Sequence, residues 1–245
     1  MKKISFICCY TRPDLVEELK ESVKDYSSFD MEWVLIDNSD GKYSSAAAAL
    51  NAGFKKSTAD VLVFLHHDIE FDTEATLLSI YREAMNGHVV GVAGRKENGG
   101  PLVTTITDGK NKERSHYYNF QSESEPVLAC DECVLAMSRE TYLKVGGFDE
   151  VNFDGWHFYG VDLCLRAKEK GITSVVVPTK LWHKSTGNHD KNWEFYEERL
   201  HRLYKDKYKV IYYPCGRCYT NYALYRLTKL LRPLRKRTLQ KRRLG

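Results

Sequence analysis

The sequence predicts an α/β fold in which a mostly parallel central sheet carries helices on both faces. Short apolar runs alternate with helical patterns over the first hundred residues, which is the order of βαβ units. The run VLVFL at 61–65 is apolar at every position, as expected of a strand covered on both faces. It leads directly into His66, His67 and Asp68. Because open α/β sheets bind ligands outside the carboxyl ends of their strands, this polar cluster marks a candidate site.

The first strand and helix are predicted from apolar spacing. KKISFICCY at 2–10 reads as a strand, and Pro13 lies near the first turn of the helix PDLVEELKESVKDY. The apolar residues of that helix recur at helical spacing: Leu15, Val16, Leu19 and Val23. The second strand, MEWVLIDNSD, ends in Asp37 and Asn38. These two residues add a second polar group at the carboxyl edge of the predicted sheet.

Two further helices and a fourth strand follow in alternation. SSAAAALNAGFKKS is predicted to be a helix that begins at Ser44 or Ser45, because serine is a favourable N-cap. DTEATLLSIYREAMNG begins at Asp72 or Thr73 and ends at Gly87. HVVGVAGR then supplies the fourth strand.

The second half has a mixed order of elements. Residues 96–125 are polar and rich in turn formers, which predicts a long, partly mobile loop of the kind that closes over active sites. PVLACDECVLAMSRETYLKVGGF predicts a strand, a turn and a short helix, and VDLCLRAKEKG and ITSVVVP predict a helix and a last strand. From NWEFYEERLHRLYKDKY onward the pattern is helical. We expect one α/β domain over 1–206 and a basic helical extension over 207–245.

Composition indicates a globular, cytoplasmic protein. No apolar run approaches the ~20 residues that a membrane-spanning helix needs, and the N-terminus reads as a first strand, not a signal peptide. The odd number of cysteines, 7, favours reduced thiols over a disulfide framework.

The cysteines also raise the alternative of a zinc site. Cys130 and Cys133 form one C-x₂-C pair, and Cys215 and Cys218 form a second. The interval 134–214 is far longer than that of a zinc ribbon, and a strand would point the first two thiols to opposite faces. Buried free thiols are therefore the favoured interpretation.

Basic residues are concentrated in the C-terminal segment. Residues 207–245 hold 12 Lys or Arg and no acid, which leaves 25 basic and 33 acidic residues in 1–206. Leucines recur at helical spacing among these cations: Leu224, Leu227, Leu230, Leu231 and Leu234. An apolar stripe flanked by cations predicts a helix on an anionic membrane surface. A solvated tail or RNA contact, with interleaved tyrosines, is the competing account.

Six motifs in order resemble the inverting glycosyltransferases of family 2, which have a GT-A fold. They are YTRPD after the first strand, LIDNSD, ALNAGFKKSTADVLVFLHHD, VGGFDE, FYGVDLCLRAKEKG and LWHKSTG, and they span roughly residues 4–187. The resemblance implies a transferase that moves a sugar from a nucleotide diphosphate donor to an acceptor.

The resemblance implies a divalent metal at the end of the third strand. In the family, an Asp-x-Asp motif there holds a metal that bridges the two donor phosphates, and the matching residues are His66, His67 and Asp68. His183 in LWHKSTG matches a histidine that completes the metal shell in some members. A site of Asp68, His183 and His66 favours Mn²⁺ over Mg²⁺, because Mg²⁺ prefers oxygen ligands. The alternative is that the histidines only end a strand at the surface.

The resemblance also assigns residues to the donor nucleotide. They are Cys9, Tyr10, Arg12, Asp37, Asn38, Asn51 and His67, with Cys8 along the same loop. Asp37 can accept hydrogen bonds from a uracil N–H or from ribose hydroxyls, although DNSDG is also a common turn sequence. The arginine that precedes Asn51 in the family is absent, and Leu50 stands in its place.

The general base is less clearly marked. Relatives commonly supply an Asp just before the DL-x-LR helix, and here that position is Gly160. Asp162 remains as a candidate base, although it could cap the helix. Asp131 or Asp154 could replace it, and Asp131 and Glu132 could hold the acceptor. A protein that transfers poorly or not at all is the third possibility.

The sequence thus predicts a Mn²⁺-dependent glycosyltransferase that uses a UDP-linked donor and a glycan or lipid-linked acceptor, with peripheral membrane association through 224–245. Aromatic residues beside the site suit sugar rings, or alternatively the core: Trp156, Phe158, Tyr159 and Trp182. The main alternative is a catalytically impaired partner subunit that binds nucleotide or glycan. A nucleotidyltransferase is disfavoured because CYTRPD lacks a glycine-rich phosphate loop.

Overall fold

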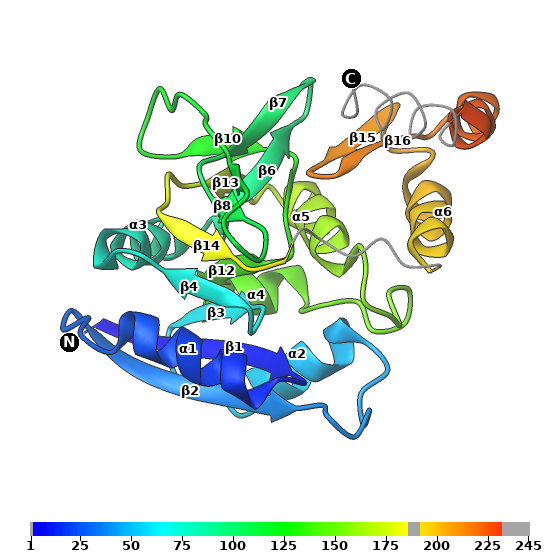
Figure 1. The fold of residues 1–245 in the computed structure, drawn as a ribbon. Coiled ribbons are helices and arrows are strands. Elements are labelled where there is room, and N and C mark those ends of the chain that lie inside the picture. The colour runs from blue at the N-terminus through cyan, green and yellow to red at the C-terminus, as the bar shows by residue number, and fades with distance from the viewer. Residues whose placement is uncertain (1, 186–191, 232–245) are drawn as a thin grey trace.

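The computed structural model describes residues 2–185 and 192–231 of the 245-residue chain. Its centre is a seven-stranded sheet in the order β10-β13-β5-β12-β3-β1-β2 (Figure 1). Its strands are β1 (Lys2–Tyr10), β2 (Phe29–Asp37), β3 (Val61–Leu65), β5 (Val89–Gly91), β10 (Glu125–Val127), β12 (Val134–Ser138) and β13 (Ser174–Val176). Only β12 and β10 run against the other strands of this sheet. The predicted mostly parallel sheet is confirmed.

Three smaller sheets complete the β-structure of the described residues. One has the order β11 (Ala129–Cys130), β6 (Ala93–Lys96), β7 (Gly99–Thr104). A second has the order β4 (Ile69–Phe71), β14 (Leu181–His183), β8 (Thr107–Asp108), β9 (Arg114–Ser115). The third is the hairpin β15 (Val210–Tyr213) and β16 (Gly216–Tyr219).

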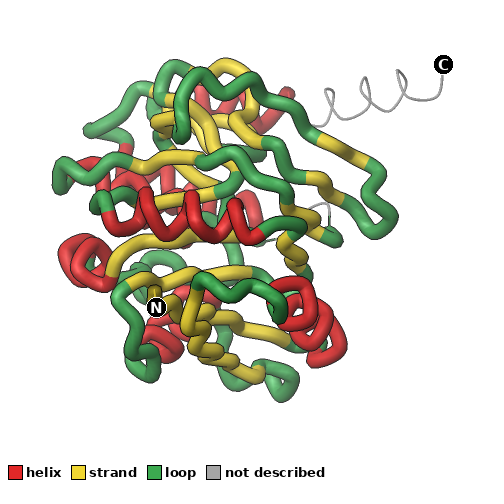
Figure 2. The backbone as a smooth tube through the Cα atoms, turned by 90° about the vertical axis from the view of Figure 1, so that its left-hand side faces the viewer, coloured by secondary structure: helices red, strands yellow, loops and turns green. Residues whose placement is uncertain are grey.

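Helices cover both faces of the central sheet (Figure 2). They are α1 (Pro13–Val23), α2 (Ala46–Phe54), α3 (Glu74–Met85), α4 (Arg139–Val145), α5 (Tyr159–Glu169) and α6 (Trp193–Tyr204), and residues 222–231 are also helical. Alternate residues of each strand face opposite layers. Phe6 and Val63 pack with α1 and α3, whereas Ile7 and Phe64 pack with α2, α4 and α5. The burial of VLVFL on both faces follows from these two layers.

Local capping chemistry sets several helix ends as predicted. Ser45, not Ser44, caps α2, and its side chain accepts a hydrogen bond from the Ala48 N–H at 3.1 Å. Gly146 ends α4 with a φ of 95°, a left-handed conformation that glycine adopts without strain.

Three predictions about secondary structure are wrong. The predicted strand HVVGVAGR divides into β5 in the central sheet and β6 in the second sheet, and β4 was not predicted. Much of 96–125 is not loop. β7 pairs with β6, β8 with β14 and β9 with β8, so these strands satisfy their backbone groups despite their polar side chains. Residues 210–219 form a hairpin, not a helix, since VIYY is rich in β-formers and PCG supplies a turn.

The structure describes only part of the C-terminal segment for which a membrane-surface helix is predicted. No helix in 2–185 or 192–231 combines the length and apolarity needed to cross a bilayer. The rest of the predicted membrane-surface segment, from residue 232, lies outside the described residues. The domain boundary at 206 stays a prediction.

Candidate active site

The carboxyl ends of β1, β2 and β3 meet at one edge of the sheet. Tyr10 pairs with Asp37, and Cys8 pairs with Leu65. A cavity of about 760 Å³ opens at this edge, a size typical of small-molecule sites. His66, Asp68 and Glu132 are among the residues that line it. The apolar run at 61–65 therefore positions the polar cluster where the sheet geometry predicts a site.

His66, Asp68 and His183 form the one metal-competent group found among the described residues, with ligand atoms that all lie within 4.8 Å of one another. Asp68 Oδ1 lies 3.4 Å from His183 Nε2 and 3.9 Å from His66 Nδ1. β3 delivers His66 and Asp68, and the antiparallel pairing of β14 with β4 brings His183 beside them. Residues 115 positions apart thus form one cluster.

The histidines keep the Asp68 carboxyl ionised. Burial by itself would raise the pKa of Asp68, but His183 and His66 lower it well below its usual range. Burial favours the neutral form of His183 and would lower its pKa, yet contact with Asp68 raises the pKa of that imidazole. The Oγ of Ser185 lies 3.0 Å from His183 Nε2. The cluster therefore presents an anionic oxygen between two imidazoles.

A second polar network adjoins the cluster through β8, which pairs with β14. Asp108 is opposite His183 in that pairing. Its carboxylate accepts a hydrogen bond from Arg114 Nε at 2.6 Å and lies 2.9 Å from His116 Nε2. Arg114 and His116 both line the cavity. This side of the cavity therefore carries a guanidinium close to the candidate metal ligands.

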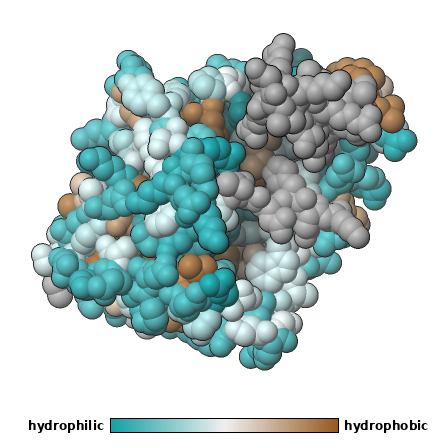
Figure 3. Space-filling model, in the orientation of Figure 1, coloured by the Kyte–Doolittle hydropathy of each residue, from teal (hydrophilic) through white to brown (hydrophobic). Residues whose placement is uncertain are grey.

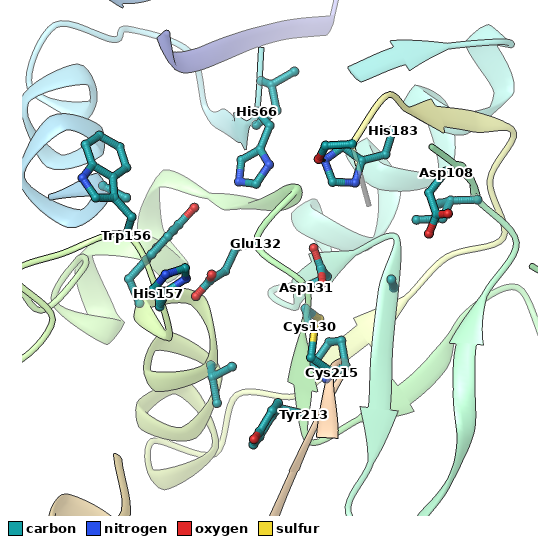
Figure 4. A pocket seen from close by; sticks show the side chains of 18 of the residues that line it. His66, Asp108, Cys130, Asp131, Glu132, Trp156, His157, His183, Tyr213 and Cys215 are labelled. Atoms are coloured by element: carbon teal, nitrogen blue, oxygen red, sulfur yellow. The ribbon is translucent and has the colours of Figure 1, made fainter. Parts of the chain in front are cut away.

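Asp131 and Glu132 lie across the cavity from His66 and His183, in the turn between β11 and β12 (Figure 4). Asp131 Oδ1 accepts a hydrogen bond from the Cys133 N–H at 3.0 Å. Glu132 Oε1 accepts one from the Gly160 N–H at 2.9 Å. Burial raises the pKa of Glu132 to about 8. The two sides of the cavity thus hold carboxyl groups in different electrostatic environments.

Comparison with known proteins gives the family. Residues 5–211 match the profile of a family described as "Glycosyltransferase like family". The chain belongs to this family. It is therefore a transferase of the glycosyltransferase class. No curated protein matches the sequence.

A solved structure gives the fold of this glycosyltransferase. The chain resembles the crystal structure of GalNAc-T7 with UDP, GalNAc and Mn²⁺, with a TM-score of 0.56 and 10% sequence identity. The match covers 84% of this chain and 51% of the other, so the chain spans about half the length of that relative. The predicted GT-A fold is confirmed.

The residues assigned to the nucleotide fall into two groups. Cys9 and His67 line the cavity of the glycosyltransferase. The others are not among the lining residues: Tyr10, Arg12, Asp37, Asn38 and Asn51. Asp37 Oδ1 accepts hydrogen bonds from the N–H and the hydroxyl of Ser39, at 2.9 and 2.6 Å, which is the geometry of the turn alternative. The nucleotide-binding assignment of these residues stays a prediction.

Three of these side chains have structural partners in the glycosyltransferase. Asn38 donates to the carbonyl of Tyr43 and accepts from its N–H, which closes the 38–43 loop. The Arg12 guanidinium pairs with the neighbouring Asp14. Asn51 joins α2 to the backbone of Phe148, through bonds of 2.9 and 3.1 Å.

The predicted base Asp162 is turned away from the cavity. Its side chain is 2% exposed, Oδ2 accepts from Arg166 Nε at 2.7 Å and Oδ1 accepts from the Tyr204 hydroxyl at 2.7 Å. Asp154, the other alternative, accepts from Arg199 at 2.7 Å and does not line the cavity. Of the carboxylates proposed for the base, the structure brings only Asp131 to the cavity.

The aromatic residues divide between rim and core. Trp156 is 42% exposed and lines the cavity, whereas Phe158 and Tyr159 also line it but are 1% and 4% exposed. Trp182 does not line it, and its indole N–H donates to the carbonyl of Gly109 at 2.8 Å. Trp156 therefore offers the accessible aromatic face of the group.

The two cysteine pairs lie in different surroundings. The Cys130 thiol donates to the carbonyl of Val175 at 3.7 Å, and its N–H donates to Cys164 Sγ at 3.5 Å. Cys218 is buried and contacts the carbonyl of Glu197, whereas Cys215 is exposed. All seven cysteines are free thiols in the structure.

Sequence reasoning missed part of the site. It treated Arg114 and His116 as loop residues, because no apolar periodicity marks β8 and β9. It also placed the β15–β16 hairpin in a separate helical extension, although Tyr213, Pro214 and Cys215 line the cavity. The β-rich composition of VIYY before the PCG turn was the available signal for this hairpin.

Proposed function

We propose that this glycosyltransferase transfers a sugar from a UDP-linked donor to a glycan or lipid-linked acceptor, with inversion and with a divalent metal. The observation that carries the proposal is the His66–Asp68–His183 cluster at the carboxyl end of β3, inside the cavity. It supplies a metal-competent group at the edge of the sheet where α/β folds bind nucleotides.

The donor set fits Mn²⁺. Two imidazoles and one ionised carboxylate lie close enough to share an ion, and Mn²⁺ accepts nitrogen ligands more readily than Mg²⁺ does. A bound divalent ion neutralises the negative charge that develops on a departing diphosphate. Arg114, whose guanidinium is paired with Asp108, lies on the same side of the cavity and offers further N–H donors. These residues favour the binding of a diphosphate at this wall.

The choice of UDP is supported by the relative, whose structure contains UDP, GalNAc and Mn²⁺. Trp156 supports an acceptor sugar at the cavity rim, because an exposed indole face packs against the apolar face of a sugar ring. With the donor at the carboxyl end of β3 and the acceptor near Trp156, the sugar would be transferred in the cavity between these two positions.

We also propose that the C-terminal helix lies on the inner face of an anionic cytoplasmic membrane. Within 222–231, Tyr225 is buried against His201, whereas four leucines are exposed: Leu224, Leu227, Leu230 and Leu231. This helix carries the apolar surface at the upper right of Figure 3. Flotation with anionic liposomes tests the proposal, and a chain truncated after residue 223 that floats as well as the full chain would contradict it.

The metal site is tested with Asp68→Ala. We expect UDP with Mn²⁺ to raise the Tm of the wild type and to release free UDP from UDP-sugars, and we expect D68A to lose both effects. Asp72→Ala is the matched control, because Asp72 is exposed and four residues further along the chain. Equal Mn²⁺-dependent stabilisation of D68A and wild type would overturn the metal assignment. Tight UDP binding without turnover of any donor would instead favour the non-catalytic partner subunit.

A further inference from the structure

The start of α5 offers no carboxylate to the cavity. Gly160 has no side chain, and the carboxylate of Asp162 is held by Arg166 and Tyr204 on the other side of the helix. An inverting transfer needs a group that takes the proton from the acceptor hydroxyl as that oxygen attacks the sugar. A proton acceptor from another element must therefore reach this position if the proposed reaction takes place here.

Glu132 fills the space next to Gly160. A Cβ atom added to Gly160 would lie 2.7 Å from Glu132 Cγ and 2.8 Å from Leu135 Cδ1. These distances are too short for any side chain at position 160 while Glu132 keeps its place. Glu132 can therefore occupy this position only because residue 160 is a glycine.

Backbone groups at the start of α5 hold the Glu132 carboxyl in place. The Gly160 N–H donates to Oε1 at 2.9 Å, and the Phe158 backbone, like this N–H, acts to lower the pKa of the carboxyl. Phe158 has a φ of 65°, a left-handed conformation that costs a non-glycine residue about 1 kcal/mol or more. The strained backbone at Phe158 is thus one of the groups that surround this carboxyl.

The surroundings of Glu132 suit a group that exchanges protons near neutral pH. Its pKa is raised to about 8: burial is the largest cause, Asp131 and Cys164 act in the same direction, and the Gly160 N–H acts in the opposite one. Tyr159 and Cys215 also interact with it electrostatically, and His157 lies near it in Figure 4 and lines the same cavity. A proton acceptor is most effective when its pKa lies near the working pH.

We propose that Glu132 is the general base of the transfer. Its carboxylate takes the proton of the acceptor hydroxyl, and the acceptor oxygen forms a bond to the anomeric carbon of the donor sugar. The bond from that carbon to the diphosphate oxygen breaks, and its electron pair leaves with the nucleoside diphosphate. This role rests on the proposed function, because it requires a sugar nucleotide in the cavity.

The test uses Glu132→Gln in the full chain, with Mn²⁺ and a panel of UDP-sugars. Release of UDP is followed with water as the acceptor, and with a glycan acceptor once one is found. We expect kcat to fall by about 10²–10⁴-fold, while the affinity for UDP with Mn²⁺ stays unchanged. In the wild type, kcat/KM should rise with pH with a midpoint near 8 and level off above it, and this rise should be absent in E132Q. Glu140→Gln is the matched control, because Glu140 is an exposed carboxyl eight residues further along the chain.

A relocated carboxylate sharpens the test. Glu132→Ala removes one of the two close contacts at position 160, and the other is with the end of the flexible Leu135 side chain. The double variant E132A/G160D should therefore recover at least about tenfold of the kcat lost in E132A. Recovery would support a base at this position, whereas a purely structural role of Glu132 would give none.

The outcomes separate the two proposals. If the wild type releases UDP and E132Q keeps its rate and pH profile, Glu132 is not the base, although the glycosyltransferase function stands. Loss of activity in D131N but not in E132Q would likewise overturn this assignment in favour of Asp131. If the wild type binds no UDP with Mn²⁺, both the proposed function and the role of Glu132 fail.

Discussion

The two walls of the cavity hold carboxyl groups whose pKa values move in opposite directions. At the β3 and β14 wall, two histidines outweigh burial and lower the pKa of Asp68. At the β11–β12 turn, burial is the largest influence on Glu132 and raises its pKa to about 8. Burial and neighbouring charge, not residue type, therefore separate the ionised carboxyl group of the candidate metal site from the carboxyl group proposed to exchange a proton.

A third carboxylate, Asp162, is also buried but has no access to the cavity. Burial raises its pKa too, and yet its two oxygens are bonded to Arg166 and Tyr204 and do not reach the cavity. A raised pKa alone therefore does not identify a catalytic group. The geometry of the partners separates Asp162 from Glu132, and substitutions at the two positions should behave differently.

The largest effect on stability is expected from Asp162→Asn. Removal of one partner from a buried ion pair leaves Arg166 without its counter-charge, so we expect the free energy of unfolding to fall by about 3–5 kcal/mol. Urea denaturation at neutral pH measures this loss, and release of UDP per folded molecule should stay close to that of the wild type. A D162N protein with normal stability and no transfer would restore Asp162 as the base predicted from sequence.

An effect of similar size and opposite sign is expected from Glu132→Gln. The pKa of Glu132 is about 8 in the folded chain and 4.5 as an ordinary glutamate, so the folded state holds a proton that the unfolded state releases between these values. Wild-type stability should therefore fall as pH rises from 4.5 to about 8, and E132Q should not share this loss. At about 1.36 kcal/mol per pKa unit, we expect E132Q to gain about 4 kcal/mol relative to wild type between pH 5 and 9. Urea denaturation of both proteins across this range, with E140Q as the control, measures it, and a difference that does not change with pH would contradict the burial of Glu132.

The smallest effect is expected from Trp156→Ala. Loss of one aromatic face against a sugar costs about 1 kcal/mol, so the KM for a glycan acceptor should rise roughly fivefold, while UDP affinity stays unchanged. Phe195→Ala is the control, because Phe195 is 54% exposed and is not a lining residue of the cavity. A rise in the KM for the donor alone would instead indicate that Trp156 contacts the donor sugar.

Much of the fold could be predicted from sequence because its signals are local. Apolar runs and capping residues such as Ser45 and Gly146 specify strands and helix ends within a few residues of themselves. The polar residues after 61–65 could be placed at one edge of the sheet, since parallel strands align their carboxyl ends. The pairing of His183 with Asp68 needed the resemblance as well, because 115 residues separate them.

The remaining features depend on contacts that no local pattern encodes. The polar sequences of β8 and β9 do not reveal these strands, because they form by pairing with each other and with the distant β14. The β15–β16 hairpin has a local signal in VIYY and PCG, but its place at the cavity depends on tertiary packing.

By itself, the sequence determined the alternation of strands and helices, the apolar third strand and the position of Asp68 at its end. Only the tertiary structure placed Glu132 against Gly160, 28 residues away, and turned Asp162 toward Arg166 and Tyr204. The physical reason is that strand and helix propensities act over a few residues. Burial, and the charges that shift a pKa, are set by whichever distant segments pack together.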